Sequence, residues 1–142
     1  MEVKAKKIRV NKNFSPCPVS DEDEVYRNGI FEFNIAKMIE YIQKNSADIG
    51  REPVAVKDFC KEFSSIDEVH VDKVDVSQPV ILAEIAPGLY NLIDGNHRME
   101  KARRMGLVSL MAHKMDVERH MKFLTSKKAY AAYIAYWNSK LG

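Results

Sequence analysis

Cysteine is scarce in this sequence, and long apolar segments are missing. Two of the 142 residues are cysteine, Cys17 and Cys60. Two cysteines provide neither a disulfide framework nor the spacing of a zinc finger, so we expect a reducing compartment, the cytoplasm. No run approaches the roughly 20 apolar residues of a membrane span, and no apolar segment follows the N-terminal lysines as in a signal peptide. We therefore expect a cytoplasmic protein that does not bind membranes.

A large excess of charge of either sign is also missing. Lys and Arg number 22 against 20 Asp and Glu, which gives a net charge of +2. This balance predicts no general attraction to nucleic acid or membrane surfaces. One basic cluster near the N-terminus keeps DNA open as a partner, and it consists of Lys4, Lys6, Lys7, Arg9 and Lys12. The length and an apolar content of 46% predict one globular domain over residues 1–142.

The most informative stretch runs from residue 92 to residue 106 and predicts a strand, a tight turn and a helix. Leu92 and Ile93 favour a strand, and Asp94-Gly95 is a typical turn dipeptide. The residues from 96 to 105 contain no glycine or proline, and Gly106 then marks the end of a helix. We therefore expect the helix to begin directly after Gly95.

The start of this helix predicts a seat for an anion. The first backbone N–H groups of a helix have no partner within the helix, and the helix dipole favours negative charge there. Arg98 adds a planar guanidinium that suits phosphate, with His97 beside it. In the alternative interpretation, Asp94 caps the helix, and His97 and Arg98 are solvated residues of its first turn. The residues alone leave both interpretations open.

One motif in this stretch resembles the signature of the ParB/sulfiredoxin superfamily: Ile93-Asp94-Gly95-Asn96-His97-Arg98, followed by Lys101, Ala102 and Gly106. In that signature an apolar residue precedes Asp-Gly-x-His-Arg and a helix that ends at glycine. Residues 74–83 resemble the strand before the motif and residues 107–115 the strand after it, so the resemblance covers about residues 69–116. It implies an α+β fold with a small mixed β-sheet and packed helices, here with a C-terminal helical segment over residues 117–140.

The resemblance also implies that the motif handles nucleotides. The residues that would hold the phosphates of ATP, ADP or CTP are Gly95, Asn96, His97, Arg98 and Lys101. Asp94 would orient His97 or bind Mg²⁺. Asp94 and His97 are both candidates for catalysis. Three activities stay open: a nucleotide-dependent phosphotransferase, a ParB-like nuclease or DNA-binding protein, and a non-catalytic module in which a nucleotide regulates binding to a partner.

One departure from the superfamily pattern excludes an activity. Asn96 stands where sulfiredoxins carry their catalytic cysteine. A thiolate is the nucleophile in that chemistry, and an amide cannot replace it. We therefore exclude sulfiredoxin activity. The residues after the motif are also too few for the helix-turn-helix and dimerisation domains of chromosome-partition ParB proteins, so we do not expect DNA binding of that type.

Glu84 is a further candidate for catalysis, in a strand predicted over residues 80–85. Pro87-Gly88 predicts a turn after it, so this strand and residues 89–93 form a β-hairpin. In a phosphotransferase, Glu84 would serve as a base or as a Mg²⁺ ligand beside Asp94. The alternative is a solvated strand end, and the sequence does not decide between them.

The remaining segments predict scaffold elements, with one candidate interface. We expect a loop over residues 14–29, a helix from Ile35 to about residue 46 capped by Asn34, a strand over 53–56, a helix from Asp58 to Phe63 with Cys60 in the core, an interrupted strand pattern over 69–76, and helices that begin after Asp116 and near Ser126. His113, Glu118 and His120 match no standard metal spacing. The last predicted helix carries an aromatic stripe on one face, which either covers the core or docks a second copy in a homodimer. The stripe consists of Tyr130, Tyr133, Ile134, Trp137 and Leu141.

Overall fold

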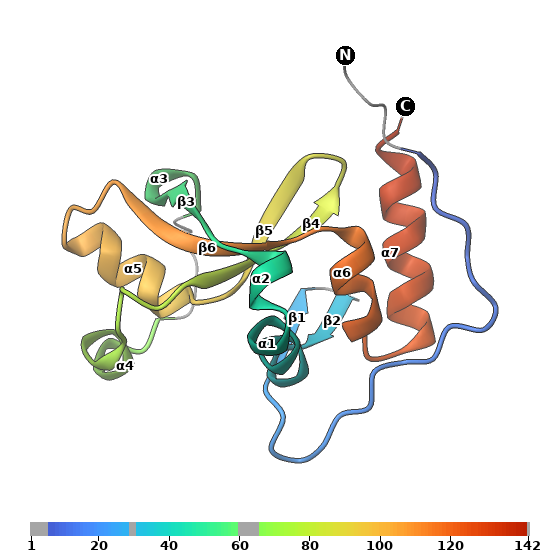
Figure 1. Cartoon of the computed structure of the whole chain (residues 1–142), viewed down its shortest axis with the longest axis horizontal. Coiled ribbons are helices and arrows are strands. Elements are labelled where there is room, and N and C mark those ends of the chain that lie inside the picture. Colours follow the sequence, from blue (N-terminus) through green and yellow to red (C-terminus); the bar gives the residue numbers. More distant parts are fainter. Residues whose placement is uncertain (1–5, 29–30, 60–65, 142) are drawn as a thin grey trace.

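The structure, a computed structural model, describes residues 6–28, 31–59 and 66–141, and it has the α+β architecture expected from the sequence (Figure 1). The strands are β1 (Val25–Asn28), β2 (Phe31–Asn34), β3 (Glu52–Ala55), β4 (Val80–Ala86), β5 (Leu89–Asp94) and β6 (Ser109–Met115). The helices are α1 (Ile35–Lys44), α2 (Ser46–Ile49), α3 (Val56–Phe59), α4 (Glu68–Lys73), α5 (Asn96–Arg104), α6 (Val117–His120) and α7 (Lys127–Ser139), with a 3₁₀ turn, η1 (Met121–Phe123), before α7.

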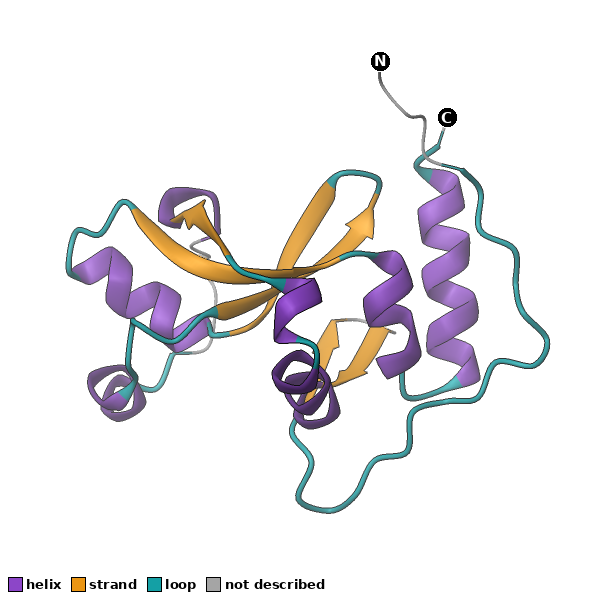
Figure 2. Ribbon diagram, in the orientation of Figure 1, coloured by secondary structure: helices purple, strands orange, loops and turns teal. Residues whose placement is uncertain are grey.

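The main sheet has the strand order β3-β6-β4-β5 and is mixed, as expected (Figure 2). β4 runs parallel to β6, while β5 pairs antiparallel with β4 and β3 pairs antiparallel with β6. The almost continuous apolar sequence of β4 is explained by its position, because the strand is buried on both faces of the sheet. The predicted hairpin of β4 and β5 is confirmed, with Gly88 at a positive φ of 74° in its turn.

Two hydrophobic clusters cover the two faces of this sheet. The larger cluster packs the hairpin β1–β2, α1 and α7 against one face; its fully buried members include Phe33, Met38, Ile81, Met115 and Tyr133. The smaller cluster packs α3 and α5 against the other face; it includes Val56, Val80, Leu82, Met99 and Ala102. The motif helix α5 is thus anchored by its apolar side on Met99 and Ala102, which leaves its N-terminal turn at the edge of the sheet.

The hairpin of β1 and β2 is a second, two-stranded sheet that the sequence analysis missed. The loop expected over residues 14–29 is therefore wrong from Val25 onward. Part of the signal was present in the sequence, since a glycine, Gly29, precedes alternating apolar residues at Phe31 and Phe33. Asn34 ends β2 and caps α1, because its side-chain oxygen accepts the backbone N–H of Lys37 at 3.0 Å as predicted.

Two helices differ from the sequence expectation. The pattern over residues 69–76 is not a strand, because Glu68–Lys73 form α4, capped by the carboxylate of Asp67. Helix α3 begins at Val56 rather than after Asp58, and the expectations for Cys60 and Phe63 lie outside the described residues. Elsewhere the local signals are confirmed, since Asp116 and Ser126 cap α6 and α7 through their side chains.

The aromatic stripe of α7 is used inside the chain. Tyr130, Tyr133 and Trp137 are at most 5% exposed. The extended N-terminal segment 6–17 lies along α7, where Phe14 stacks on Tyr130 with ring centroids 3.9 Å apart and Trp137 Nε1 donates to the Lys6 carbonyl at 3.0 Å. The stripe therefore covers the core, and it does not present these side chains to a second copy. Among the described helices, none has the length and apolar composition to cross a membrane.

Candidate functional site

The motif folds as predicted into a strand end, a glycine turn and a helix. β5 ends at Asp94, Gly95 has a left-handed backbone with a φ of 107°, and α5 begins at Asn96. A Cβ atom on Gly95 would lie 2.9 Å from the Cβ of Val80 on β4, so this position needs glycine for space as well as for its backbone. Gly106 follows the helix with a φ of 74°, which confirms the predicted end.

The first turn of α5 carries backbone N–H groups without partners. Gly95 is the N-cap and has no side chain to accept a hydrogen bond; the first bond of the helix runs from the Met99 N–H to the Gly95 carbonyl at 2.9 Å. Within the part of the chain that the structure describes, the amides of residues 96, 97 and 98 have no acceptor. Asp94 does not cap the helix, so that part of the alternative interpretation is wrong. Three donors are therefore unpaired at the positive end of the helix dipole.

Arg98 joins this helix start to the strand beside it. Its Nη2 donates to Oδ2 of Asp94 at 3.1 Å, and its Nη1 donates to the carbonyls of Pro79 and Gln78 at 2.5 and 3.4 Å. The Arg98 and Asp94 side chains are only 19% and 14% exposed. Arg98 is therefore a bridge and not a solvated residue. These contacts use three of the five guanidinium N–H donors, and the described residues provide no acceptor for the other two.

His97 and Lys101 hold the neighbouring helix α4. Nε2 of His97 accepts the backbone N–H of Asp67, the N-cap of α4, at 3.2 Å, and the His97 ring lies 4.3 Å from the ring of His70. Nζ of Lys101 donates to two carbonyls at the C-terminal end of α4, at 3.1 and 2.9 Å. The predicted phosphate-binding residues 97 and 101 therefore already have structural partners, and Lys101 does not line a cavity with the helix start.

Glu84 is not brought to the motif. It is opposite Tyr90 in the β4–β5 hairpin, whereas Asp94 is opposite Ile81, about 10 Å further along β4. Its Oε2 accepts the backbone N–H of Gly88 in the hairpin turn at 2.9 Å. This position agrees with the alternative of a strand-end residue. Glu84 therefore supplies neither a catalytic base nor a Mg²⁺ ligand beside Asp94.

A cavity of about 310 Å³ opens at the start of α5. The backbone from Gly95 to Arg98 forms one wall, and the other walls carry Glu24, Tyr26 and His70. These three residues could not be recognised from the sequence, because they come from the segment before β1, from β1 and from α4. No local spacing connects them to the motif, and only the tertiary fold brings them to it.

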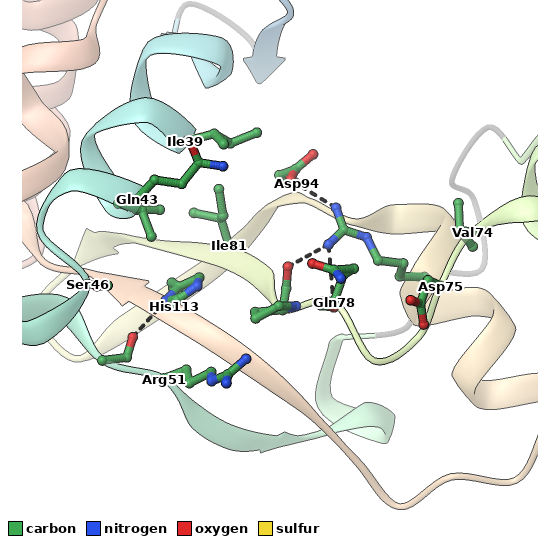
Figure 3. Close-up of a pocket in the computed structure, with 14 residues that line it drawn as sticks. Ile39, Gln43, Ser46, Arg51, Val74, Asp75, Gln78, Ile81, Asp94 and His113 are labelled. Carbon is green, nitrogen blue, oxygen red and sulfur yellow. Dashed lines mark hydrogen bonds and ion pairs between the residues drawn. The ribbon is translucent and has the colours of Figure 1, made fainter.

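A larger cavity of about 710 Å³ lies on the other side of the Arg98–Asp94 pair. Figure 3 shows Gln43, Arg51 and His113 on one side of it and Asp94 with Gln78 on the other, with Ile81 between them. The two cavities share three lining residues, Val74, Asp94 and Arg98. The ion pair therefore forms the boundary of one divided site, whose total volume is in the range of small-molecule sites.

Hydrogen bonds fix the charge states near this site. The side chain and the backbone N–H of Ser77 both bond Asp75 at the rim of the larger cavity, and these bonds lower the pKa of its carboxyl group. On the outer face of α5, Arg103 and Arg104 lower the pKa of Glu100 to about 2. Because Arg104 also pairs with Glu68 at 2.6 Å, these two arginines are neutralised by acidic neighbours and add little positive charge to the helix start.

The protein alone offers no complete metal site in its described part. There, no group of three His, Cys, Asp or Glu side chains is placed to hold an ion. His113 bonds the Gly50 carbonyl and His120 is buried against the Glu84 carbonyl, so these histidines do not gather with Glu118 around an ion. A Mg²⁺ ion at Asp94 would need further oxygen ligands from a bound molecule.

Comparison with protein-family models finds no match to this chain, and comparison with curated proteins finds no significant sequence relative. The function is therefore argued from the geometry of the divided site.

Proposed function

We propose that this protein binds a phosphate-bearing ligand, with a nucleotide as the leading candidate, and that the phosphate lies at the N-terminus of α5. The observation that carries this proposal is the set of three amide donors, at residues 96–98, that have no acceptor among the described residues and line a cavity. Backbone amides at a helix start are a recurrent phosphate-binding arrangement, because the donors and the helix dipole act together.

Arg98 supports the same assignment. Its side chain lines both cavities, and two of its N–H donors have no acceptor in the described part of the chain. The bonds to Asp94 and to the Pro79 carbonyl fix the guanidinium in place before a ligand arrives, which lowers the entropy cost of binding. An arginine held in this way suits an oxyanion that also accepts bonds from the helix amides.

Two carboxylates at the smaller cavity, Asp94 and Glu24, would repel a bare phosphate. A bound Mg²⁺ ion removes this conflict, because protein Mg²⁺ sites usually combine one or two carboxylates with phosphate oxygens of the substrate. We therefore propose that the ligand binds together with Mg²⁺ and that Asp94, with Glu24, holds the ion. When bound, Mg²⁺ would neutralise phosphate charge.

Binding without turnover agrees best with the contacts of the motif side chains. His97 accepts a bond from α4, Lys101 caps the end of α4, and Glu84 is remote. None of these three is in position to take a proton from an acceptor at the helix start. A phosphotransferase would depend on Asp94 alone, whose Oδ2 is paired with Arg98. We therefore place a nucleotide-regulated binding module first and a phosphotransferase second.

A nuclease or DNA-binding activity has less support. The basic residues at positions 6–12 lie along α7, which Figure 1 shows at the opposite end of the molecule from α5. They add no positive charge to the divided site. The superfamily resemblance itself remains part of the proposal; it is supported by the order of β4, β5, α5 and a β6 strand that returns parallel to β4.

The substitution Asn96→Asp tests the phosphate seat. It adds one negative charge to the first turn of α5, where a carboxylate is favourable for the helix but repels an anionic ligand. We expect the melting temperature of the free protein to stay the same or rise, and the affinity for inorganic triphosphate with Mg²⁺ to fall at least about tenfold, since one such interaction is worth about 1.4 kcal/mol. Isothermal titration calorimetry measures the affinity.

The control is Asn13→Asp, which makes the same chemical change at an exposed residue of the N-terminal segment. We expect its affinity for triphosphate to equal that of the unchanged protein. Equal weakening by both substitutions would indicate a nonspecific charge effect, and absence of triphosphate binding by the unchanged protein would reject the proposed function.

A further inference from the structure

The larger cavity has the lining of a site for a flat, polar-edged ring. Its floor is apolar, with Ile42 and Ile81 at 6% and 2% exposure and Ile39 beside them. Above this floor, the wall formed by α1 and β6 carries the Gln43 amide and the His113 imidazole (Figure 3). Apolar side chains pack against ring faces, while polar groups at the edge bond ring substituents. The floor and wall together suit a heteroaromatic base.

The position of this cavity also suits a base attached to phosphate. It shares Val74, Asp94 and Arg98 with the cavity at the start of α5, so one ligand can extend across this boundary. Neither compartment alone explains both kinds of lining. The smaller one has backbone donors at a helix start, and the larger one has an apolar floor and polar side chains.

The hydrogen bond of His113 determines what its other nitrogen can recognise. Nδ1 of His113 lies 2.7 Å from the Gly50 carbonyl oxygen. A carbonyl only accepts, so Nδ1 must carry the hydrogen, and in the neutral ring Nε2 is then an acceptor. An acceptor at the edge of the cavity bonds an exocyclic amine and is repelled by a carbonyl oxygen. The Gln43 amide lines the same cavity, and the described residues provide no partner for it, so it can donate to a further acceptor of the ring.

We propose that the larger cavity holds the base of the nucleotide and that His113 selects bases with an exocyclic amine, adenine or cytosine, over the matching bases with a carbonyl group, hypoxanthine or uracil. This inference rests on the proposed function, because the phosphate seat brings the ligand to the cavity. His113 is the specificity-determining residue, and Gly50 fixes its tautomer through the backbone carbonyl. Neither His113 nor Gln43 belongs to the motif at residues 93–98.

The test compares ligand pairs that differ in this one group. Calorimetry at pH 8 measures the affinities of ATP against ITP and of CTP against UTP, with inorganic triphosphate as the reference for the phosphate seat. We expect the amino member of at least one pair to bind about tenfold more tightly than its keto partner, which is the effect of exchanging one hydrogen bond for a repulsive contact. A larger affinity ratio for ATP over ITP would indicate that the cavity holds a purine, and a larger ratio for CTP over UTP would indicate a pyrimidine.

The decisive variant is His113→Asn. The shorter amide can still donate to the Gly50 carbonyl, but it removes the acceptor at the position of Nε2. We expect the amino-to-keto ratio to fall below about twofold while the affinity for inorganic triphosphate stays unchanged. Met111→Asn is the control, because Met111 lies on the same strand β6 but lines neither cavity; it should preserve the ratio.

The outcomes separate the two proposals. If triphosphate binds but amino and keto nucleotides bind equally, or if His113→Asn keeps the discrimination, the base assignment is wrong and the phosphate seat stands. If nucleotides bind no more tightly than triphosphate, the larger cavity does not receive the base and the inference is also wrong. If neither triphosphate nor any nucleotide binds, the proposed function fails, and the inference fails with it.

Discussion

Gly95→Ala is expected to destabilise the protein by about 3 kcal/mol, because the substitution combines a backbone penalty with a steric one. A φ of 107° lies outside the favourable range of alanine, which costs about 1–2 kcal/mol. The added methyl group would lie 2.9 Å from the Cβ of Val80, a fully buried residue of the central strand β4. Overpacking of this kind adds about 1–3 kcal/mol, because β4 is fixed on both sides by neighbouring strands. Urea unfolding measures the loss.

Gly88→Ala is the matched control for this prediction. Gly88 also has a positive φ, 74°, but nothing lies within 4 Å of the position of an added Cβ atom. Its substitution should cost only the backbone term, about 1 kcal/mol. The difference between the two substitutions isolates the close approach of the motif turn to β4. Equal losses at both glycines would show that Gly95 is not packed against Val80 as described.

The folded protein is expected to lose about 2 kcal/mol of stability between pH 7.5 and pH 5 through His120 alone. This ring is fully buried between Phe33 and Tyr133, and burial lowers its pKa to about 4. Its Nε2 donates to the Glu84 carbonyl at 2.7 Å, and within the described structure its Nδ1 is buried without a partner. A proton on Nδ1 would therefore be a buried charge with no acceptor, so the folded state keeps the ring neutral.

The direction of the pH effect follows from the two states of His120. The unfolded chain binds a proton on this residue near the ordinary pKa of 6.5, whereas the folded chain binds it only near pH 4. Between these values the unfolded state holds more protons, so the free energy of unfolding falls as the pH falls. A pH of 5 lies about 1.5 pH units below the unfolded-state pKa of 6.5. This difference corresponds to a loss of about 2 kcal/mol in the free energy of unfolding.

Comparison with His120→Phe isolates this contribution. Phenylalanine fills nearly the same space, and the Tyr133 hydroxyl still donates to the Glu84 carbonyl at 2.7 Å. Urea unfolding at pH 7.5 and pH 5 should show a stability change about 2 kcal/mol smaller in the variant. Carboxyl groups contribute equally to both proteins and cancel in the difference. The same pH dependence in both proteins would contradict the assignment of a neutral, buried His120.

Local signals in the sequence predicted the centre of this fold well. The turn dipeptides Asp94-Gly95 and Pro87-Gly88 correctly set the hairpin and the start of α5, because these residues act through their own backbone angles. The caps at Asn34, Asp116 and Ser126 were equally readable, since a cap bonds an amide two or three residues away. Signals that act within two or three residues do not depend on the rest of the chain.

The parts that depend on tertiary contacts were not predictable in this way. The valines at 69, 71, 74 and 76 alternate as in a strand, but Asp67 caps a helix there, and Lys101 and His97 hold that helix against α5. The lining of the divided site likewise combines Glu24, Arg51 and His113 from three distant segments. The residues of the motif line the two cavities, but the motif does not indicate which hydrogen-bond partners its side chains have.

The most direct test of the phosphate seat is an NMR titration of ¹⁵N-labelled protein with inorganic triphosphate and Mg²⁺. The amide signals of Gly95, Asn96, His97 and Arg98 report on the helix start, and those of residues 6–12 report on the basic N-terminal segment. We expect the largest chemical-shift changes at residues 96–98, because their unpaired N–H groups would bond phosphate, with a smaller change at Gly95 beside them. Changes confined to residues 6–12, or none at residues 95–98 under saturating ligand, would contradict the account.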